Sequence, residues 1–160
     1  MAMRDTEPVL VDTNVLVYAH VAEAPWHQEA QAAIADHEAT SAPRWVSRQV
    51  LREYLVNLTR PQQFPIPPAL ETVVAQVQHF QRRFRVANEG PEVTTRLLAL
   101  LREVPTRGRR IHDVNIVATM LVYGVRRLLT NNPDDFVRFA AFIDVLPLVP
   151  PPAPVPPPSA

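Results

Sequence analysis

The sequence contains no cysteine and no lysine, and only three of its 160 residues are glycine. Without cysteine there is no disulfide framework and no thiolate metal site. The few glycines form no G-x-G-x-x-G pattern, which excludes a dinucleotide-binding loop. No apolar run reaches the roughly 18 residues of a membrane span, and residues 1–8 are too polar for a secretory signal peptide. We therefore expect a cytoplasmic protein with no membrane segment.

The charges of the chain are balanced, because sixteen arginines offset sixteen acidic residues. A protein that is held on nucleic acid mainly through phosphate contacts usually has a basic balance. Any nucleic-acid role must therefore depend on local groups of arginine together with a bound metal ion. The length is that of one domain with its own core.

Short apolar runs alternate with segments of helical periodicity along the chain. Strands are expected at Val9–Val11, Trp45–Val46, Phe84–Val86, Leu128–Thr130 and Phe142–Val145. Helices are expected after Asp12, from Pro25 and Trp26 onward, and at Arg48–Thr59, Ala69–His79, Pro91–Glu103 and His112–Tyr123. This alternation is typical of right-handed βαβ units. It predicts an α/β fold with a mostly parallel central sheet, in which ligands bind beyond the carboxyl ends of the strands.

The C-terminal segment differs in composition from the rest of the chain. Eight of the twelve residues from Pro147 to Pro158 are proline. Such a segment favours extended polyproline II and adds no strand or helix. We expect one domain over residues 1–148 and a disordered tail over residues 149–160, with a docking peptide for a partner as the alternative.

Acidic residues stand beside apolar runs at four separate places. They are Asp12, Glu53, Asp113 and the pair Asp134 and Asp135. Each has a plain explanation by itself: a helix N-cap, a solvated helix flank, a cap or an arginine partner, and a turn. Burying several carboxylates unpaired is costly, however, and a divalent cation suits several at once. Together these acids predict a metal-dependent nuclease.

Four strings of the sequence resemble the PIN-domain family, and most closely the VapC-type toxins of bacterial toxin–antitoxin pairs. They are Leu10–Leu16, the helix start from Gln49 to Glu53, His112–Ala118 and Leu129–Phe136. The resemblance covers about Val9 to Leu148. It implies a three-layer α/β/α sandwich, one or two Mg²⁺ or Mn²⁺ ions per active site and endoribonuclease activity on RNA. It also implies a small antitoxin protein as partner and a homodimer.

The resemblance also implies roles for individual residues. Asp12, Glu53 and Asp113 match the three main carboxylates of the family. Two residues are candidates for the fourth position. Asn132 stands where many members have an acid, whereas Asp135 matches the family's closing Asp-Phe. Either of these two is expected to make a supporting, water-mediated metal contact, and Asp134 is expected to face solvent. Further supporting residues are Thr13, Asn14 and Thr130.

Two groups of arginines are candidates for holding RNA phosphates, since arginine forks suit phosphate oxygens. They are Arg107, Arg109 and Arg110, just before Asp113, and Arg48 and Arg52, beside Glu53. A solvated surface position is the alternative for each. Arg82, Arg83 and Arg85 flank the third expected strand and are expected to be surface residues. His112 is expected to pack or cap rather than to catalyse.

Two other functions are weighed against the nuclease. A phosphatase with an aspartyl nucleophile has Asp-x-Asp at the end of its first strand, whereas position 14 is asparagine. A PIN scaffold that binds RNA or a partner without cutting remains open because of Asn132. Metal-dependent cleavage that is lost in Asp12→Ala separates this scaffold from an enzyme.

Overall fold

The structure is a computed structural model, and it describes residues 6–61 and 66–150. The predicted proline-rich tail lies outside the described residues from position 151 onward. The predictions that rest on Met1 to Asp5 and on Pro65 lie outside them as well. No helix in the described ranges is long and apolar enough to cross a membrane.

Five parallel strands form the central sheet, in the order β3-β2-β1-β4-β5. The strands are β1 (Val9–Val11), β2 (Arg44–Ser47), β3 (Arg85–Ala87), β4 (Arg127–Thr130) and β5 (Asp144–Pro147). In the centre, Leu10 pairs with Trp45 on one side and with Leu128 on the other. β1 is buried along its whole length, which explains why its sequence is a continuous apolar run. The predicted α/β fold with a parallel sheet is confirmed.

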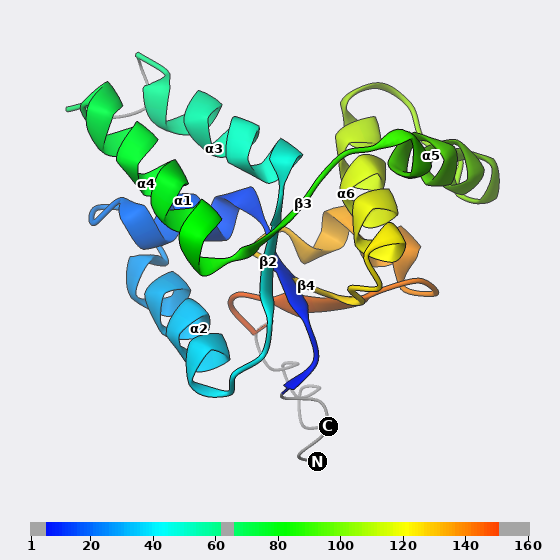
Figure 1. The fold of residues 1–160 in the computed structure, drawn as a ribbon, viewed down its shortest axis with the longest axis horizontal. Coiled ribbons are helices and arrows are strands. Elements are labelled where there is room, and N and C mark those ends of the chain that lie inside the picture. Colours follow the sequence, from blue (N-terminus) through cyan, green and yellow to red (C-terminus); the bar gives the residue numbers. More distant parts are fainter. Residues whose placement is uncertain (1–5, 62–65, 151–160) are drawn as a thin grey trace, which may run out of the picture.

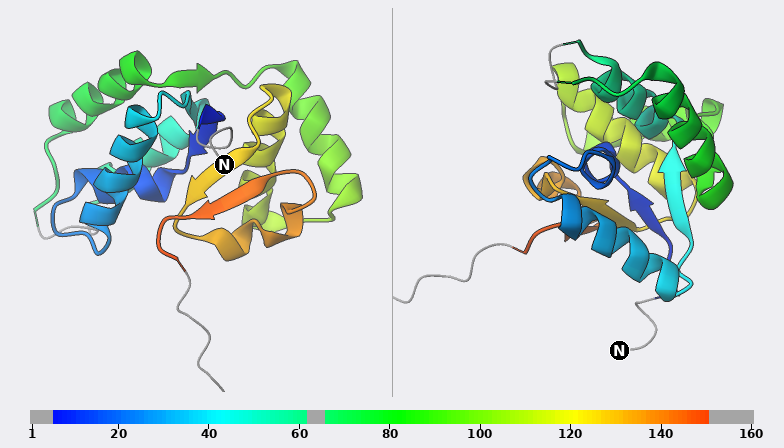
Figure 2. Two further views of the ribbon diagram at one scale, coloured as in Figure 1. Left: turned by 90° about the horizontal axis from the view of Figure 1, so that it is seen from below. Right: turned by 90° about the vertical axis from the view of Figure 1, so that its left-hand side faces the viewer.

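Helices cover both faces of this sheet, as Figures 1 and 2 show. One side carries α1 (Thr13–His20), α2 (His27–Ala39), α3 (Arg48–Thr59) and α4 (Leu70–Arg83). The other carries α5 (Pro91–Glu103) and α6 (Ile111–Val122). Short 3₁₀ helices are η2 (Gly108–Arg110), η3 (Pro133–Asp135) and η4 (Val137–Phe139). The three layers match the expected α/β/α sandwich.

Local sequence signals explain where several helices begin and end. The Ser47 hydroxyl accepts a hydrogen bond from the Val50 N–H at 3.1 Å and caps α3 as expected. Pro91 is the first residue of α5, where its missing N–H costs nothing. Gly124 follows α6 at φ 68°, and the Val125 N–H bonds back to the Met120 carbonyl at 2.9 Å. This is the Schellman ending that a glycine permits.

The boundaries of several elements differ from the sequence prediction, and α4, for example, ends at Arg83 rather than at His79. β5 begins at Asp144 rather than at Phe142, because the N–H groups of Phe142 and Ile143 both bond to the Phe139 carbonyl in a turn. Helix α2 begins at His27 rather than at Pro25. Trp26 precedes it in the left-handed region at φ 81°, a conformation that a helix cannot contain.

The chain crosses the sheet in a way that defines one special position. From β1 it continues to β2 and β3 on one side, and it then returns to β4 on the other side of β1. The strand order therefore reverses between β1 and β4. In open α/β sheets, ligand sites form at such a switch point, beyond the carboxyl ends of the strands.

Candidate metal centre

The carboxyl ends of β1 and β4 lie side by side and bring Asp12 and Thr130 together. The Asp12 N–H donates to the Leu129 carbonyl at 2.9 Å. The Thr130 hydroxyl donates to Oδ2 of Asp12 at 2.7 Å, although 118 positions separate the two residues. Both residues are buried. Thr130 therefore fixes the orientation of the Asp12 carboxylate at the switch point.

Asp12 combines a structural contact with an unusual protonation equilibrium. It is the N-cap of α1, and its Oδ1 accepts the Thr13 N–H at 2.7 Å. Burial raises the pKa of Asp12 to about 6, and the charges of Glu53 and Asp113 add to this, while the hydrogen bonds from Thr130 and Thr13 oppose it. The N-cap explanation is thus correct, but it does not balance the charge of the buried carboxylate. A cation bound nearby would do so.

Glu53 is held next to Asp12 by two side chains. The Thr13 hydroxyl donates to its Oε2 at 3.0 Å, and the Gln49 amide donates to its Oε1 at 2.8 Å. Glu53 is half-buried, so the flank of α3 on which it lies is only partly solvated. Since Thr13 contacts Glu53 and adjoins Asp12, it links the first two acids directly.

Gln49 extends this arrangement to a second helix. Its Nε2 also donates to the His112 carbonyl at 3.0 Å, and its Oε1 accepts from Nδ2 of Asn115 at 2.7 Å. The side chain is 4% exposed, and its amide has a partner at each end. Gln49 therefore ties the start of α3 to the first turn of α6, where Asp113 lies. His112 contributes its backbone to this link, and its side chain is exposed.

Asp113 lies in the first turn of α6 and is half-buried. Its Oδ2 faces Nη2 of Arg138 at 3.4 Å, so one of the expected alternatives, an arginine partner, is present. Burial raises the pKa of Asp113, and the charge of Asp135 raises it further, while Arg138 opposes the rise. The acid thus keeps a raised pKa although it has a cationic neighbour.

The residues after β4 take different positions. Asp134 and Asp135 are both exposed, and Asp135 lies close enough to act on Asp113 through its charge. The Asn132 side chain is also exposed, and its backbone N–H donates to the Thr130 hydroxyl at 3.1 Å. Asn14 holds this segment in place, because its Oδ1 accepts the Asn131 N–H at 2.9 Å. Of the two candidates for the fourth position, Asp135 is the one whose charge acts on Asp113.

The five predicted phosphate-binding arginines fall into two groups. Arg107, Arg109 and Arg110 are exposed at η2, directly before α6. Arg48 instead donates to Oδ1 of Asn88 at 3.0 Å, and Arg52 is ion-paired with Glu89 at 3.0 Å. The first group is open to a ligand, and the second is engaged with the segment that follows β3.

The donor set fits a hard divalent cation in its chemistry, because it offers carboxylate oxygens. Two of the acids, Asp12 and Asp113, have a raised pKa. Within residues 6–61 and 66–150, however, no three acidic or histidine residues are grouped closely enough to form a ready-made metal cage. Internal donors also hold the oxygens of Asp12 and Glu53. A cation would have to take over some of these contacts.

Sequence reasoning missed the roles of Gln49, Asn115 and Arg138. A signal existed for the first, since Gln49 lies four residues before Glu53, where side chains of one helix meet. Asn115 lies two residues after Asp113 and gives no periodic signal of its own. Arg138 is 25 positions from Asp113, and nothing in the sequence relates the two.

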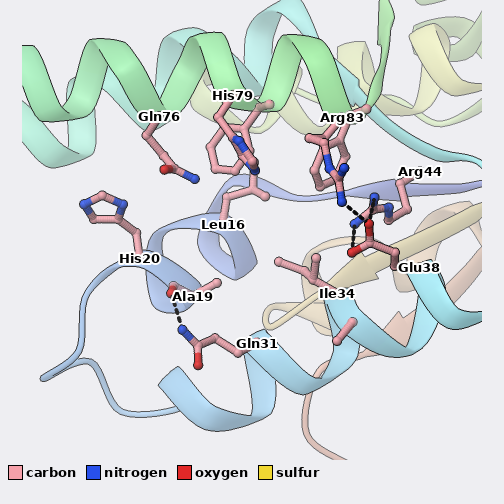
Figure 3. Close-up of a pocket in the computed structure, with 13 residues that line it drawn as sticks. Leu16, Ala19, His20, Gln31, Ile34, Glu38, Arg44, Gln76, His79 and Arg83 are labelled. Carbon is pink, nitrogen blue, oxygen red and sulfur yellow. Dashed lines mark hydrogen bonds and ion pairs between the residues drawn. The ribbon is translucent and has the colours of Figure 1, made fainter.

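A second charged region lies between α1, α2 and α4, in a pocket of about 360 Å³. We call it the Glu38 pocket (Figure 3). The Glu38 carboxylate forms ion pairs with both Arg44 and Arg83. Leu16 and Ile34 contribute apolar lining, and His20 and His79 stand nearby. The prediction that Arg83 is a surface residue is confirmed, since it is exposed.

Comparison with known proteins gives a family and a set of similar structures. The family model described as PIN domain matches residues 9–141. A sarcin–ricin-loop-cleaving toxin, VapC20 of Mycobacterium tuberculosis, is 18% identical with a TM-score of 0.62, over 85% of this chain and 96% of that one. No curated protein matches the sequence.

Two further similar structures are complexes. A toxin–antitoxin complex from Klebsiella pneumoniae is 21% identical with a TM-score of 0.62, over 88% of this chain and 98% of that one. VapBC2 of Rickettsia felis, bound to promoter DNA, is 18% identical with a TM-score of 0.62, over 87% and 98%. At these sequence identities, the likeness shows a shared fold alone.

Proposed function

Because the chain belongs to the PIN-domain family, we propose that it is a metal-dependent endoribonuclease and the VapC-type toxin of a toxin–antitoxin pair. The observation that carries the proposal is the grouping of Asp12, Glu53 and Asp113 at the switch point of the sheet. The charges of Glu53 and Asp113 raise the pKa of Asp12, and the charge of Glu53 also acts on Asp113. Mutual repulsion of this kind favours the binding of a cation.

In this proposal, Asp12, Glu53 and Asp113 would hold one or two Mg²⁺ or Mn²⁺ ions, supported by Asp135 or Asn132. When bound, such an ion would supply a water of lowered pKa and neutralise negative charge on the phosphate. Hydrolysis joins the water oxygen to phosphorus and breaks the P–O bond to the leaving ribose oxygen, which takes up a proton.

The other residues of the site position these acids. Thr130 and the Thr13 N–H fix the two oxygens of Asp12, and Gln49 fixes Glu53 relative to α6. Asn14 donates to both Asp12 and Thr130, at 3.2 and 3.3 Å. Such preorganisation keeps the acids close together without a metal, and a cation would take over some of these hydrogen bonds when it binds.

Phosphates of the RNA would be held beside this centre by arginines. Arg107, Arg109 and Arg110 are exposed next to the first turn of α6. They could bind a phosphate without breaking a contact between two elements. We include Arg48 and Arg52 as well, although an RNA would first have to displace Asn88 and Glu89 from them.

The test is cleavage of a mixed RNA pool by wild type and Asp113→Asn, each with EDTA, Mg²⁺ or Mn²⁺. The proposal expects cutting that needs metal and disappears in the variant. If no condition gives cutting and calorimetry detects no Mn²⁺ binding, the acids are structural caps. The alternative, a PIN scaffold that binds RNA or a partner without cutting, then takes its place. Asn132, where many members have an acid, is the observation that favours this alternative.

We further propose a small antitoxin as partner, since the similar structure from Klebsiella pneumoniae is solved as a toxin–antitoxin complex. An arm of the antitoxin would cover the acidic residues. Expression of this chain alone should arrest growth, and co-expression of a neighbouring small gene should restore it; harmless expression would contradict the toxin role. We also propose a cytoplasmic homodimer, which light scattering on a size-exclusion column would detect.

A further inference from the structure

Arg138 brings a permanent positive charge to the candidate metal ligands. It lies on η4, and its Nη2 is 3.4 Å from Oδ2 of Asp113. Both side chains are 24% exposed, so solvent screens this pair less than a pair on the open surface. Asp135 lies three residues before Arg138 on the same segment and also acts on Asp113 through its charge.

The contact with Asp113 is not the only one that Arg138 makes. A strong bond between an arginine and a carboxylate is about 2.7–2.9 Å long, and 3.4 Å exceeds this. The guanidinium carbon instead lies 5.0 Å from the centre of the buried Phe139 ring, a cation–π contact. Packing against Phe139 thus helps to hold the positive charge beside Asp113.

The guanidinium also has hydrogen-bonding capacity that the described residues do not use. Its Nε is buried and has no acceptor among the residues that the structure describes. A buried donor without a partner is unfavourable, and an arginine side chain that lay fully on the surface would avoid this cost. The buried Nε cannot be reached from solvent, but the side chain is 24% exposed, so an RNA phosphate next to Asp113 would accept from the exposed part of the arginine fork.

We propose that Arg138 is a phosphate-binding residue of the metal centre, which weakens metal binding in the free protein and strengthens RNA binding once a metal is present. A fixed positive charge beside Asp113 opposes a divalent cation there. The same charge attracts the phosphate that is to be cleaved. The second half of this inference rests on the proposed nuclease function, and the first half does not.

The first experiment measures Mn²⁺ binding by calorimetry without RNA, in wild type, Arg138→Gln and Arg138→Lys. Loss of the charge in Arg138→Gln should tighten Mn²⁺ binding about three- to tenfold, and Arg138→Lys should bind nearly as wild type does. Unchanged or weaker Mn²⁺ binding in Arg138→Gln overturns the proposal. So does a tightening of equal size in Arg138→Lys, because the effect would then not come from charge.

The second experiment measures the binding of a fluorescent pool of single-stranded RNA in Ca²⁺. Arg138→Gln should lose about tenfold in RNA affinity, the equivalent of one charge-assisted hydrogen bond or more, and Arg138→Lys should lose less. If wild type binds RNA and Arg138→Gln binds it equally well, the phosphate contact is refuted. A wild type that binds no RNA refutes the proposed function and the phosphate contact together, while the Mn²⁺ result still judges the charge effect.

The matched control is Arg82→Gln, which removes one arginine at the other end of the sheet. Arg82 is exposed near the end of α4, close to where β3 begins, whereas the acids lie where the strands end. Both Mn²⁺ and RNA affinity should change less than about twofold, since screening by salt is strong over that distance. Circular dichroism of each variant shows whether it is folded. If Arg138→Gln is not folded, Arg138→Lys alone decides: its RNA affinity must fall while its Mn²⁺ affinity stays unchanged.

Discussion

The acidic residues at the switch point and the Glu38 pocket both contain ionised carboxylates, but they balance their charge in opposite ways. In the Glu38 pocket one carboxylate is shared by two arginines, Arg44 and Arg83. At the switch point, the charges of Glu53 and Asp113 act on Asp12, and those of Glu53 and Asp135 act on Asp113. Among the described residues, Arg138 is the arginine that pairs with Asp113. The Glu38 carboxylate is thus compensated within the chain, whereas the acids at the switch point outnumber the arginine beside them.

The difference explains why the two regions suit different roles. The paired charges of the Glu38 pocket lie at the surface, where such pairs contribute little to stability. At the switch point, the buried Asp12 has a pKa of about 6, so its ionisation works against folding in the absence of a cation. Carboxylates that the chain leaves uncompensated are typical of sites that bind a cation from solution.

The largest expected effect concerns catalysis and compares two equivalent substitutions. Asp113→Asn should lower metal-dependent RNA cleavage by about a thousandfold or more, because removing a metal ligand removes several kcal/mol of transition-state stabilisation. Glu38→Gln, an equally small change, should alter the cleavage rate less than about twofold. Rates on the same RNA pool at saturating Mn²⁺ check this. Equal losses in the two variants would remove the distinction between the two regions.

The second effect concerns the pH dependence of stability in EDTA. Since the folded protein holds the Asp12 proton more tightly than the unfolded chain does, the contribution of Asp12 to stability falls as the pH rises. It is most favourable below the usual pKa of 3.8 and is lost as the pH passes about 6. The loss amounts to roughly 3 kcal/mol at most. We expect the unfolding free energy of wild type, relative to Asp12→Asn, to decrease by that order between pH 4 and 7.5.

Saturating Mn²⁺ should abolish or reverse this decrease in wild type, because the cation favours the ionised carboxylate. Glu38→Gln should show the wild-type pH dependence in both conditions, which makes it the control. A difference between wild type and Asp12→Asn that does not vary with pH would show that the Asp12 carboxylate is already compensated within the chain.

The third effect concerns Gln49, which connects the two helices of the site. Gln49→Met keeps the side-chain length and removes both amide functions, so that the His112 carbonyl and the Asn115 amide lose a partner. Unpaired buried groups of this kind cost about 1–3 kcal/mol. Urea denaturation should show this loss, together with weaker Mn²⁺ binding, because Glu53 then keeps only its hydrogen bond from Thr13. Wild-type Mn²⁺ affinity in this variant would mean that Gln49 has only a structural role.

Much of the fold could be predicted from sequence because local signals agree with each other. The buried run Val9–Val11, the cap at Ser47 and the ending at Gly124 each act over a few residues, and the structure has all three. The start of β5 could not be placed, because Phe142 is a good strand residue by itself. Only the turn around the Phe139 carbonyl excludes it from the strand.

The site was predictable in part for the same reason. Asp12 and Thr130 each follow a strand, and parallel strands end at one edge, so their proximity could be expected. The contacts of Arg48 with Asn88 and of Arg138 with Asp113 span 40 and 25 positions. They depend on how η4 packs near α6 and on which strands are neighbours, and neither leaves a periodic mark in the sequence.

The smallest expected effect concerns the Glu38 pocket itself. Glu38 and Arg83 are each about half exposed, with side-chain exposures of 47% and 54%, so solvent weakens their attraction and each side chain loses rotamer freedom when it pairs. A double-mutant cycle of Glu38→Ala and Arg83→Ala should give a coupling energy below about 1 kcal/mol in urea denaturation. Mn²⁺ affinity should stay at the wild-type value in all three variants, because this carboxylate lies away from the switch point.

Arg44, whose side chain is only 10% exposed and lies 4.8 Å from the centre of the Phe84 ring, should remain packed without Glu38. A coupling energy of several kcal/mol would show instead that ion pairs within the chain stabilise this fold strongly. The acids at the switch point, which lack such partners, would then lower the free energy of unfolding by more than we expect here.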